Sequence, residues 1–284
     1  MKLAVTGGAG LVGRFIVEDA LARGDSVSVL CHQAPAPGFF SGPVTHVPYA
    51  LGDRPALSGF DAVIHCAFSH VPGRYRGGEG DDPNGFVCAN LDGSVALFEA
   101  AKADAVSRVL FLSTRAVYGA YPPGTVLHED LEPRPDTLYG RVKWQAEQAL
   151  QALSGNGFNG VSLRATGIYG PAGPGRPHKW TDLFADFRAG RPIAPRKGTE
   201  LHGRDLAAAA RLVMAAAPGP WNLSDIVLDR HDLLAMVAGL TGIDHPPPPR
   251  ATGKVSAMAT DRLRALGWRP GGMDLLRATL PALI

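Results

Sequence analysis

The chain opens with Lys2-Leu-Ala-Val-Thr-Gly-Gly-Ala-Gly-Leu-Val-Gly13, and a helical pattern over residues 14–23 follows directly. The apolar, β-branched residues before the glycines predict a buried strand. In such a unit, one glycine makes the tight turn, another lets the backbone approach a pyrophosphate, and a third lets the helix pack closely on the strand. Backbone N–H groups of the first helical turn then hold phosphate. The stretch predicts a dinucleotide-binding loop, with an ordinary βα turn as the alternative.

The rest of the first half alternates between strand-like and helical patterns. This alternation predicts an α/β fold with a doubly wound parallel sheet, whose ligands bind at the carboxyl ends of the strands. We expect strands at 3–6, 26–30, 44–48, 62–66, 109–113 and 160–163, and helices at 11–22, 86–103 and 138–153.

Tyr139 and Lys143 stand four residues apart at the start of the last of these helices. Residues at this spacing share one helix face. A lysine ammonium beside a phenol favours its ionised form and lowers its pKa from the usual value of about 10. The spacing is also common on solvated helix faces. The spacing indicates a catalytic pair only in combination with the glycine loop that precedes it.

These features together resemble the extended branch of the short-chain dehydrogenase/reductase superfamily, which contains sugar-nucleotide epimerases, dehydratases and related reductases. The resemblance covers most of the chain. The matching segments are the glycine loop at 6–13, the fourth strand at 61–67, Asn90 with the four residues after it, the fifth strand at 111–119, the segment 163–171 and the C-terminal motif 266–270.

The resemblance implies a Rossmann doubly wound parallel sheet with a small C-terminal substrate-binding lobe. We expect an NAD(P)-binding domain at 1–170 and a mostly helical lobe at 171–284, part of which returns to the main domain. The implied activity is that of an NAD(P)-dependent oxidoreductase or epimerase, which moves hydride at a hydroxyl or carbonyl of a sugar-like or nucleotide-sugar substrate. The alternative is a non-catalytic NAD(P)-sensing or scaffold protein on the same fold. A homodimer through helices 86–103 and 138–153 is a further implication.

The resemblance also assigns roles to residues. Tyr139 is the acid/base, Lys143 tunes it and binds the nicotinamide ribose, and Thr114 orients the reacting oxygen. The residues expected at the cofactor are Gly7, Gly10, Leu11, Val12, Gly13, Cys31, His32, Leu51, Ala67, Asn90, Ser113, Tyr139 and Lys143. The residues expected at the substrate, by their position after strands, are Phe68, His70, Arg115, Thr166 and Trp180, with Arg74 and Arg76 as further candidates.

Several positions depart from the family pattern. No Asp or Glu stands near Cys31, which removes a repulsion against a 2′-phosphate and mildly favours NADP over NAD. His32 and Arg14 are the nearby basic residues. The residues after Thr114 lack the Asp-Glu pair of 4,6-dehydratases, which argues against that activity.

The substrate lobe also departs from the pattern. Gly167 replaces an asparagine that contacts substrate in several epimerases, and Arg196, Lys197 or Arg204 could replace a phosphate-binding arginine. The lobe is short, so a nucleotide-free sugar, a sugar acid, a lactone or a small ketone stays open.

Composition narrows the partners. The net charge is +2 with no Lys/Arg cluster, so we expect a small-molecule substrate and no nucleic acid. No apolar run approaches the roughly 20 residues of a membrane helix, and we expect no signal peptide because Met1 leads into a strand. Three cysteines suggest reduced thiols in a cytoplasmic protein. His65 and His70 lack a third ligand at a sensible spacing, so we expect no metal.

Overall fold

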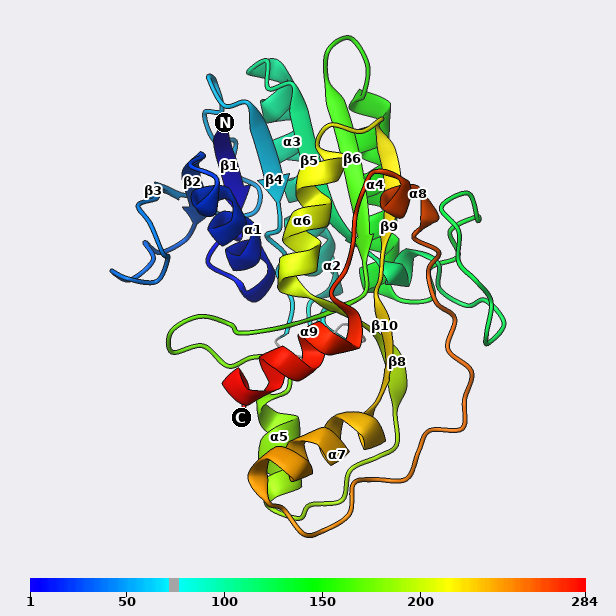
Figure 1. Cartoon of the computed structure of the whole chain (residues 1–284). Helices are drawn as coiled ribbons and strands as arrows, with labels where there is room; N and C mark the ends of the chain where they lie inside the picture. Colours follow the sequence, from blue (N-terminus) through cyan, green and yellow to red (C-terminus); the bar gives the residue numbers. More distant parts are fainter. Residues whose placement is uncertain (72–76) are drawn as a thin grey trace.

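A seven-stranded parallel sheet forms the centre of the computed structural model, which describes residues 1–71 and 77–284 (Figure 1). The strand order is β3-β2-β1-β4-β5-β6-β9, and every neighbouring pair is parallel. This confirms the predicted doubly wound sheet. The strands are β1 (Lys2–Thr6), β2 (Ser26–Cys31), β3 (Thr45–Pro48), β4 (Ala62–His65), β5 (Arg108–Thr114), β6 (Asn159–Ala165) and β9 (Gly219–Leu223).

Helices cover both faces of this sheet. Helices α1 (Leu11–Ala22) and α6 (Gly203–Val213) pack together on one face, and α3 (Gly93–Ala103) and α4 (Leu138–Leu153) pack together on the other. Each face of the sheet has its own apolar core, and β1 contributes to both. Leu3 and Val5 belong to the core under α1 and α6, and Ala4 belongs to the core under α3 and α4. Alternate side chains of a strand point to opposite faces, so a continuous apolar run is what a doubly covered strand requires.

The helix predicted at 86–103 begins earlier and changes its winding. It starts as α2 (Pro83–Val87), where the Asp82 side chain accepts a hydrogen bond from the Gly85 N–H at 2.8 Å. A π-helical turn over Cys88–Asp92 then connects it to α3. Such turns are rare and frequent at functional sites, and this one contains Asn90.

A small lobe lies beyond the carboxyl ends of the main strands. It contains a three-stranded sheet in the order β10-β8-β7, made of β7 (Gly167–Tyr169), β8 (Lys197–His202) and β10 (Ile226–Asp229). Its helices are α5 (Thr181–Arg188), α7 (Arg230–Thr241) and α9 (Gly272–Thr279). The lobe has an apolar core of its own, which includes Tyr169, Trp180, Phe184, Leu234 and Leu276. Its three strands were not predicted, because β7 and β10 have only three and four residues and β8 is mostly polar.

The chain returns to the main body between parts of this lobe. Helix α6 packs on α1, β9 adds the edge strand beside β6, and α8 (Asp261–Ala265) contacts both α6 and β9. Trp268, fully buried, donates through Nε1 to the carbonyl oxygen of Asp205 at 2.9 Å. Residues after 170 therefore contribute to both parts (Figure 1). No helix among residues 1–71 and 77–284 has the length and apolar composition needed to cross a membrane.

Candidate active site

The glycine loop joins β1 to α1 in a geometry that only glycines allow. Gly7 has a φ of +64°, and a Cβ there would lie 2.7 Å from the backbone nitrogen of Ala67. A Cβ on Gly13 would lie 2.3 Å from the carbonyl oxygen of Gly7. Gly10 precedes the helix and gives no side-chain cap, so the N–H groups of Leu11 and Val12 have no acceptor within the helix. This uncapped helix start fits the diphosphate of a dinucleotide.

A hydrogen-bonded histidine holds the carboxyl ends of β1 and β4 together. His65 Nδ1 lies 2.6 Å from Thr6 Oγ1, and its Nε2 lies 2.9 Å from Ser94 Oγ on α3. The Ala67 N–H also donates to Thr6 Oγ1, at 3.2 Å. Burial, aided by the charge of Lys143, lowers the pKa of His65 to about 3. His65 is therefore a neutral link between two strands and a helix. Among the described residues, no group of three His, Cys, Asp or Glu side chains could hold a metal ion.

Asn90 fixes the loop that follows β4. Its Oδ1 accepts a hydrogen bond from the Ser69 N–H at 2.7 Å, and its Nδ2 donates to the carbonyl oxygens of Ser69 at 2.8 Å and Phe86 at 2.9 Å. The Asn90 amide thus uses both N–H donors and its oxygen acceptor in hydrogen bonds to the protein backbone. Asn90 positions the loop that carries Phe68.

Tyr139 stands in the first turn of α4, opposite Thr114 at the end of β5. Thr137 begins that helix by accepting a hydrogen bond from the Gly140 N–H at 3.0 Å. Burial raises the pKa of the Tyr139 phenol, while a hydrogen bond with the Thr114 side chain lowers it. The net shift is upward, opposite to the expectation from the Tyr139–Lys143 spacing, because burial outweighs that hydrogen bond.

Lys143 is buried between two aromatic rings. Its Nζ lies 4.3 Å from the centre of the Phe68 ring and 4.5 Å from that of Phe111. Phe68 also contacts Tyr139, edge to face, with ring centres 5.1 Å apart. Burial lowers the pKa of Lys143 to about 7. Phe68 therefore connects the two residues that the spacing argument singled out.

A buried ionic network lies one turn further along α4. Arg164 of β6 donates to Glu147 through both Nε and Nη2, the latter at 2.7 Å, and its Nη1 donates to the Tyr118 hydroxyl at 3.0 Å. Ser113 donates to the same carboxylate, so its side chain is directed toward Glu147 of α4. Glu147 and Arg164 were missed at the sequence level. The signal was present, because Glu147 follows Lys143 by one further helical turn.

The other residues expected at the cofactor lie around the same sheet edge. At the end of β2, Cys31 donates through Sγ to the carbonyl oxygen of Gln33 at 3.0 Å, and His32 is exposed. Arg14 forms an ion pair with Glu18 at 3.0 Å. Leu51 lies in the loop that packs against Gly93 of α3.

The residues expected at the substrate are distributed over both parts of the molecule. Thr166 donates to the carbonyl oxygen of Thr199 at 2.8 Å, and Arg115 donates to that of Ser256 at 2.9 Å. His70 is exposed beside Phe68, and Arg74 and Arg76 lie outside the described residues. Trp180 is in the lobe. Phe68, of this set, contacts Tyr139.

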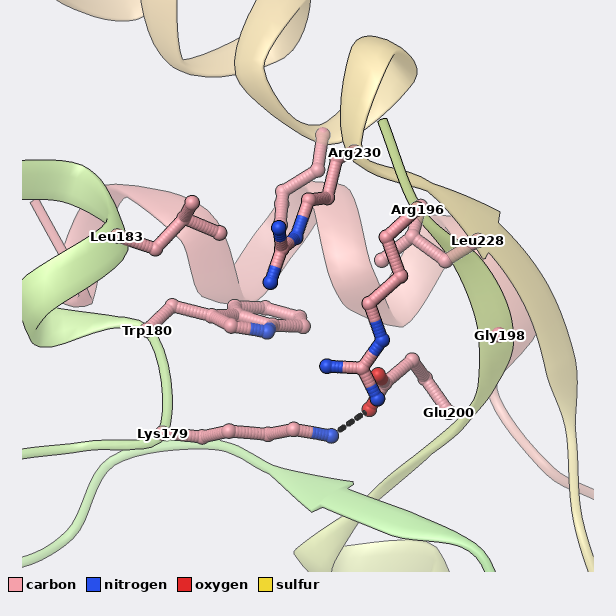
Figure 2. A pocket seen from close by; sticks show the side chains of 9 residues that line it. Lys179, Trp180, Leu183, Arg196, Gly198, Glu200, Leu228 and Arg230 are labelled. Atoms are coloured by element: carbon pink, nitrogen blue, oxygen red, sulfur yellow. Dashed lines mark hydrogen bonds and ion pairs between the residues drawn. The ribbon is translucent and has the colours of Figure 1, made fainter. Parts of the chain in front are cut away.

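Trp180 lines a cavity of about 110 Å³ in the lobe, between β8, β10, α5 and α7 (Figure 2). Lys179 and Glu200 form an ion pair on one side of the Trp180 ring. A Cβ on Gly167 would collide with the Lys179 ammonium, so this pair fills the space of a side chain at position 167. The full lining is Lys179, Trp180, Leu183, Arg196, Gly198, Glu200, Leu228, Arg230 and Leu233.

Comparison with known proteins agrees with this arrangement. The model of the NAD dependent epimerase/dehydratase family matches residues 3–224. A UDP-glucose 4-epimerase from Corynebacterium glutamicum is 29% identical over 188 residues, which are 62% of this chain and 55% of that protein. A dTDP-glucose 4,6-dehydratase from Streptomyces niveus is 28% identical over 194 residues, 60% of this chain and 55% of that protein. The chain spans between half and two thirds of the length of the first curated relatives it matches.

Among solved structures, the Thermus thermophilus UDP-glucose 4-epimerase in complex with NAD superimposes with a TM-score of 0.80 and 29% identity. The match covers 100% of this chain and 99% of that one. The structure agrees with the sequence match in its sheet order, in the uncapped start of α1 after the glycine loop, and in the placement of Thr114, Tyr139 and Lys143. The chain belongs to the NAD dependent epimerase/dehydratase family.

Proposed function

We propose that this chain is an NAD(P)-dependent oxidoreductase or epimerase that transfers hydride at a hydroxyl-bearing carbon of a sugar-like substrate. One observation carries the proposal: the Tyr139 phenol lies beside the Thr114 side chain and packs on Phe68, which covers the Lys143 ammonium, at the sheet edge where the glycine loop lies. The family match supports it, and so does the NAD in the Thermus structure.

The roles of Thr114 and Tyr139 follow from their positions. Thr114 and Tyr139 both hydrogen-bond the reacting oxygen of the substrate. The raised pKa of Tyr139 keeps its phenol protonated near pH 7, which suits donation of a proton to a carbonyl oxygen during reduction. In the reverse direction the phenolate must accept that proton, and a neighbouring positive charge favours the phenolate. The bound nicotinamide supplies the hydride acceptor and, when oxidised, such a charge.

NADP is mildly favoured as the cofactor in this proposal. No carboxylate stands at the end of β2 to repel a 2′-phosphate. The exposed His32 is the basic group beside that position, whereas the charge of Arg14 is already compensated by Glu18. The Thermus structure contains NAD, which is an argument for NAD as the cofactor.

We favour oxidoreductase or epimerase chemistry over dehydration. Elimination of water needs a base that takes a proton from carbon and an acid that protonates the departing hydroxyl. Here Arg115 and Ala116 follow Thr114, and the Arg115 guanidinium is bonded to the carbonyl oxygen of Ser256. A homodimer through α3 and α4 and a reducing, cytoplasmic location for the three unpaired cysteines complete the proposal.

The first test compares cofactor affinity and turnover. Cofactor-stripped protein is titrated with NADPH and NADH, followed by quenching of tryptophan fluorescence. Turnover is then followed at the nicotinamide absorbance band with UDP-glucose, free uronic acids and sugar phosphates. Tyr139→Phe should abolish turnover and keep cofactor binding.

Tyr121→Phe is the matched control, because Tyr121 lies outside the cluster and its hydroxyl donates to the carbonyl oxygen of Glu132. It should leave turnover unchanged. Full turnover in Tyr139→Phe would overturn the mechanism, and failure to bind either nucleotide would favour a non-catalytic protein on the same fold.

A further inference from the structure

Two aromatic rings face the Lys143 ammonium from different parts of the chain. Phe111 belongs to β5, is fully buried, and stacks on His65 with ring centres 5.7 Å apart. Phe68 is half-buried and belongs to the loop after β4. The Lys143 Nζ atom lies 4.3 Å from the centre of the Phe68 ring and 4.5 Å from that of Phe111. Phe111 is therefore part of the sheet core, whereas Phe68 is brought to the lysine by a loop.

That loop holds the Phe68 ring in a defined place. The next residue, Ser69, is bonded through both its N–H and its carbonyl oxygen to the Asn90 side chain. The Phe68 ring packs edge to face on Phe86, with ring centres 5.5 Å apart, and edge to face on Tyr139. A side chain ordered in this way loses little further freedom when it contacts a cation. The ring is therefore preorganised against the ammonium.

The other partners of the ammonium compensate its charge only in part. One of its three N–H donors goes to the carbonyl oxygen of Leu112. Glu147 lies one helical turn further along the same face of α4, and its carboxylate is bonded to Arg164 and Ser113. Burying a charge without an ion-pair partner is costly. The faces of the two rings carry partial negative charge, so they are groups that offset this cost.

An aliphatic side chain in place of Phe68 would act on the charge in the opposite sense. Burial alone lowers the pKa of a lysine, because it removes water from the ammonium. Leucine would keep that burial and offer no negative face, whereas phenylalanine attracts the cation that it covers. The aromatic residue therefore bears on whether Lys143 is protonated. It does not decide where the amine lies, since the bond to Leu112 fixes that position.

We propose that Phe68 is a positioning residue that acts through Lys143: its ring keeps the ammonium charged beside Tyr139 although the site excludes water. The inference deepens the proposed function, because a charged Lys143 favours the Tyr139 phenolate that must accept a proton during oxidation. Its consequence for turnover rests on that function. The interaction between Phe68 and Lys143 does not, and it can be measured on the whole chain without substrate.

The other titratable groups beside Lys143 keep their charge state near neutral pH. Burial, aided by the charge of Lys143, lowers the pKa of His65 to about 3, and burial raises the pKa of Cys66 to about 12. Burial also raises the pKa of the Tyr139 phenol. A pH-dependent change in an interaction of this site can thus be assigned to Lys143, whose pKa is about 7 in the folded chain.

The test is a double-mutant cycle of Phe68→Leu and Lys143→Met, measured by urea unfolding at about pH 5.5 and about pH 9. A His70→Gln background removes the histidine whose ring centre lies 6.0 Å from that of Phe68. At the lower pH Lys143 is protonated, and its coupling to Phe68 should change the folding constant about 5- to 30-fold. At the higher pH the amine is neutral, and most of the coupling should disappear. Equal coupling at the two pH values would overturn the inference.

Replacement of Phe68 by pentafluorophenylalanine is the second variant, because it keeps the shape of the ring and reverses the charge of its face. It should remove the coupling at the lower pH as completely as leucine does. Full coupling in this variant would show that packing is responsible and would also overturn the inference. Phe60→Leu is the control. The Phe60 ring has the Nζ atom of Lys2 4.7 Å from its centre, at the amino ends of β1 and β4, and its loss should leave the pH dependence due to Lys143 unchanged.

Turnover separates this inference from the proposed function. Without the ring, Lys143 loses its proton at lower pH and the phenolate is less favoured, so the pH midpoint for oxidation should rise by about one unit in Phe68→Leu. A purely structural defect would lower turnover at every pH and leave the midpoint in place. Coupling without turnover in wild type would remove the proposed function and, with it, the catalytic role of Phe68. Tyr139-dependent turnover without coupling would remove only the role of Phe68.

Discussion

The Nζ atom of Lys143 donates a hydrogen bond to the carbonyl oxygen of Leu112 at 2.7 Å, and the whole residue is only 3% exposed. The bond ties the first turns of α4 to β5 at the point where Thr114 ends that strand. A lysine held in this way keeps its position whether or not it is charged, because a neutral amine also donates.

Lys143 should make stability depend on pH in the alkaline range. Its pKa is about 7 in the folded chain and about 10.4 when unfolded. Between these values the unfolded state binds more protons, so the free energy of unfolding rises with pH from about 7 to about 10. Below pH 7 the destabilisation by the buried charge is complete and constant. Lys143→Met should remove the slope and stabilise the protein at pH 7, by on the order of 1 kcal/mol per unit of pKa shift.

Urea unfolding across this pH range measures the effect. Lys102→Met serves as the control, since Lys102 is exposed and donates to the carbonyl oxygen of Leu153. If the free energy of unfolding changed with pH in the same way for wild type and Lys143→Met, the burial argument would be contradicted.

Two helical glycines should respond in opposite ways to the same substitution. Gly13→Ala places a methyl group 2.3 Å from the Gly7 carbonyl oxygen, so it should destabilise by several kcal/mol or displace the loop and abolish cofactor binding. Gly239→Ala, in α7 with nothing within 4 Å, should stabilise by about 0.5–1 kcal/mol. Thermal unfolding and NADPH titration of both variants give the comparison. A Gly13→Ala protein that binds cofactor normally would refute the close-packing account.

The buried pair of Arg164 and Glu147 should be costly to break from one side. Arg164→Met leaves a carboxylate uncompensated inside the protein, and we expect a loss of about 3–5 kcal/mol. The double variant Arg164→Met/Glu147→Met should recover much of it, because no buried charge is left. Arg250→Met, which breaks a surface pair with Asp232, should change stability far less, because solvent screens an exposed pair. Additive losses in the double variant, measured by urea unfolding, would argue against coupling.

Cofactor preference should be adjustable at the end of β2. Cys31→Asp introduces a carboxylate that repels a 2′-phosphate and accepts bonds from ribose hydroxyls, so NADPH affinity should fall and NADH affinity should rise. Cys31→Asn has the same shape without the charge and should leave the preference near that of wild type. Fluorescence titration with both nucleotides decides. Equal shifts in the two variants would mean that charge is not the determinant.

The sequence predicted the parts of the fold that depend on local patterns. The run from Lys2 to Gly13 specified strand, loop and helix because apolar residues, glycines and helix formers follow one another without interruption. The sequence also identified Tyr139 and Lys143, because their spacing of four residues is a local pattern. It gave no hint that Phe68 would cover Lys143, because that contact joins segments 75 residues apart and depends on how the loop after β4 is held by Asn90.

The lobe cavity lined by Arg196 and Arg230 was beyond prediction for a similar reason. Arg196 was noted as a possible phosphate ligand, but Arg230 was not, since only the antiparallel register of β8 and β10 places them opposite each other. Strand β8 is mostly polar and β10 has only four residues, and their pairing is set by the tertiary packing of the lobe. Their sequences alone do not contain the alternation that marks a half-buried strand.

The return of the chain through α6 and β9 makes the small lobe a set of separate insertions rather than a domain that could be cut away. The insertion between β6 and α6 and the one between β9 and α8 begin and end at elements of the main body, and a third lobe segment, with α9, follows α8. Residues between β7 and α6, or between β9 and α8, can therefore vary in length and charge without altering the order of the seven strands. A lineage of such proteins can change these insertions while the glycine loop after β1, the loop after β4 and Thr114 at the end of β5 stay in place.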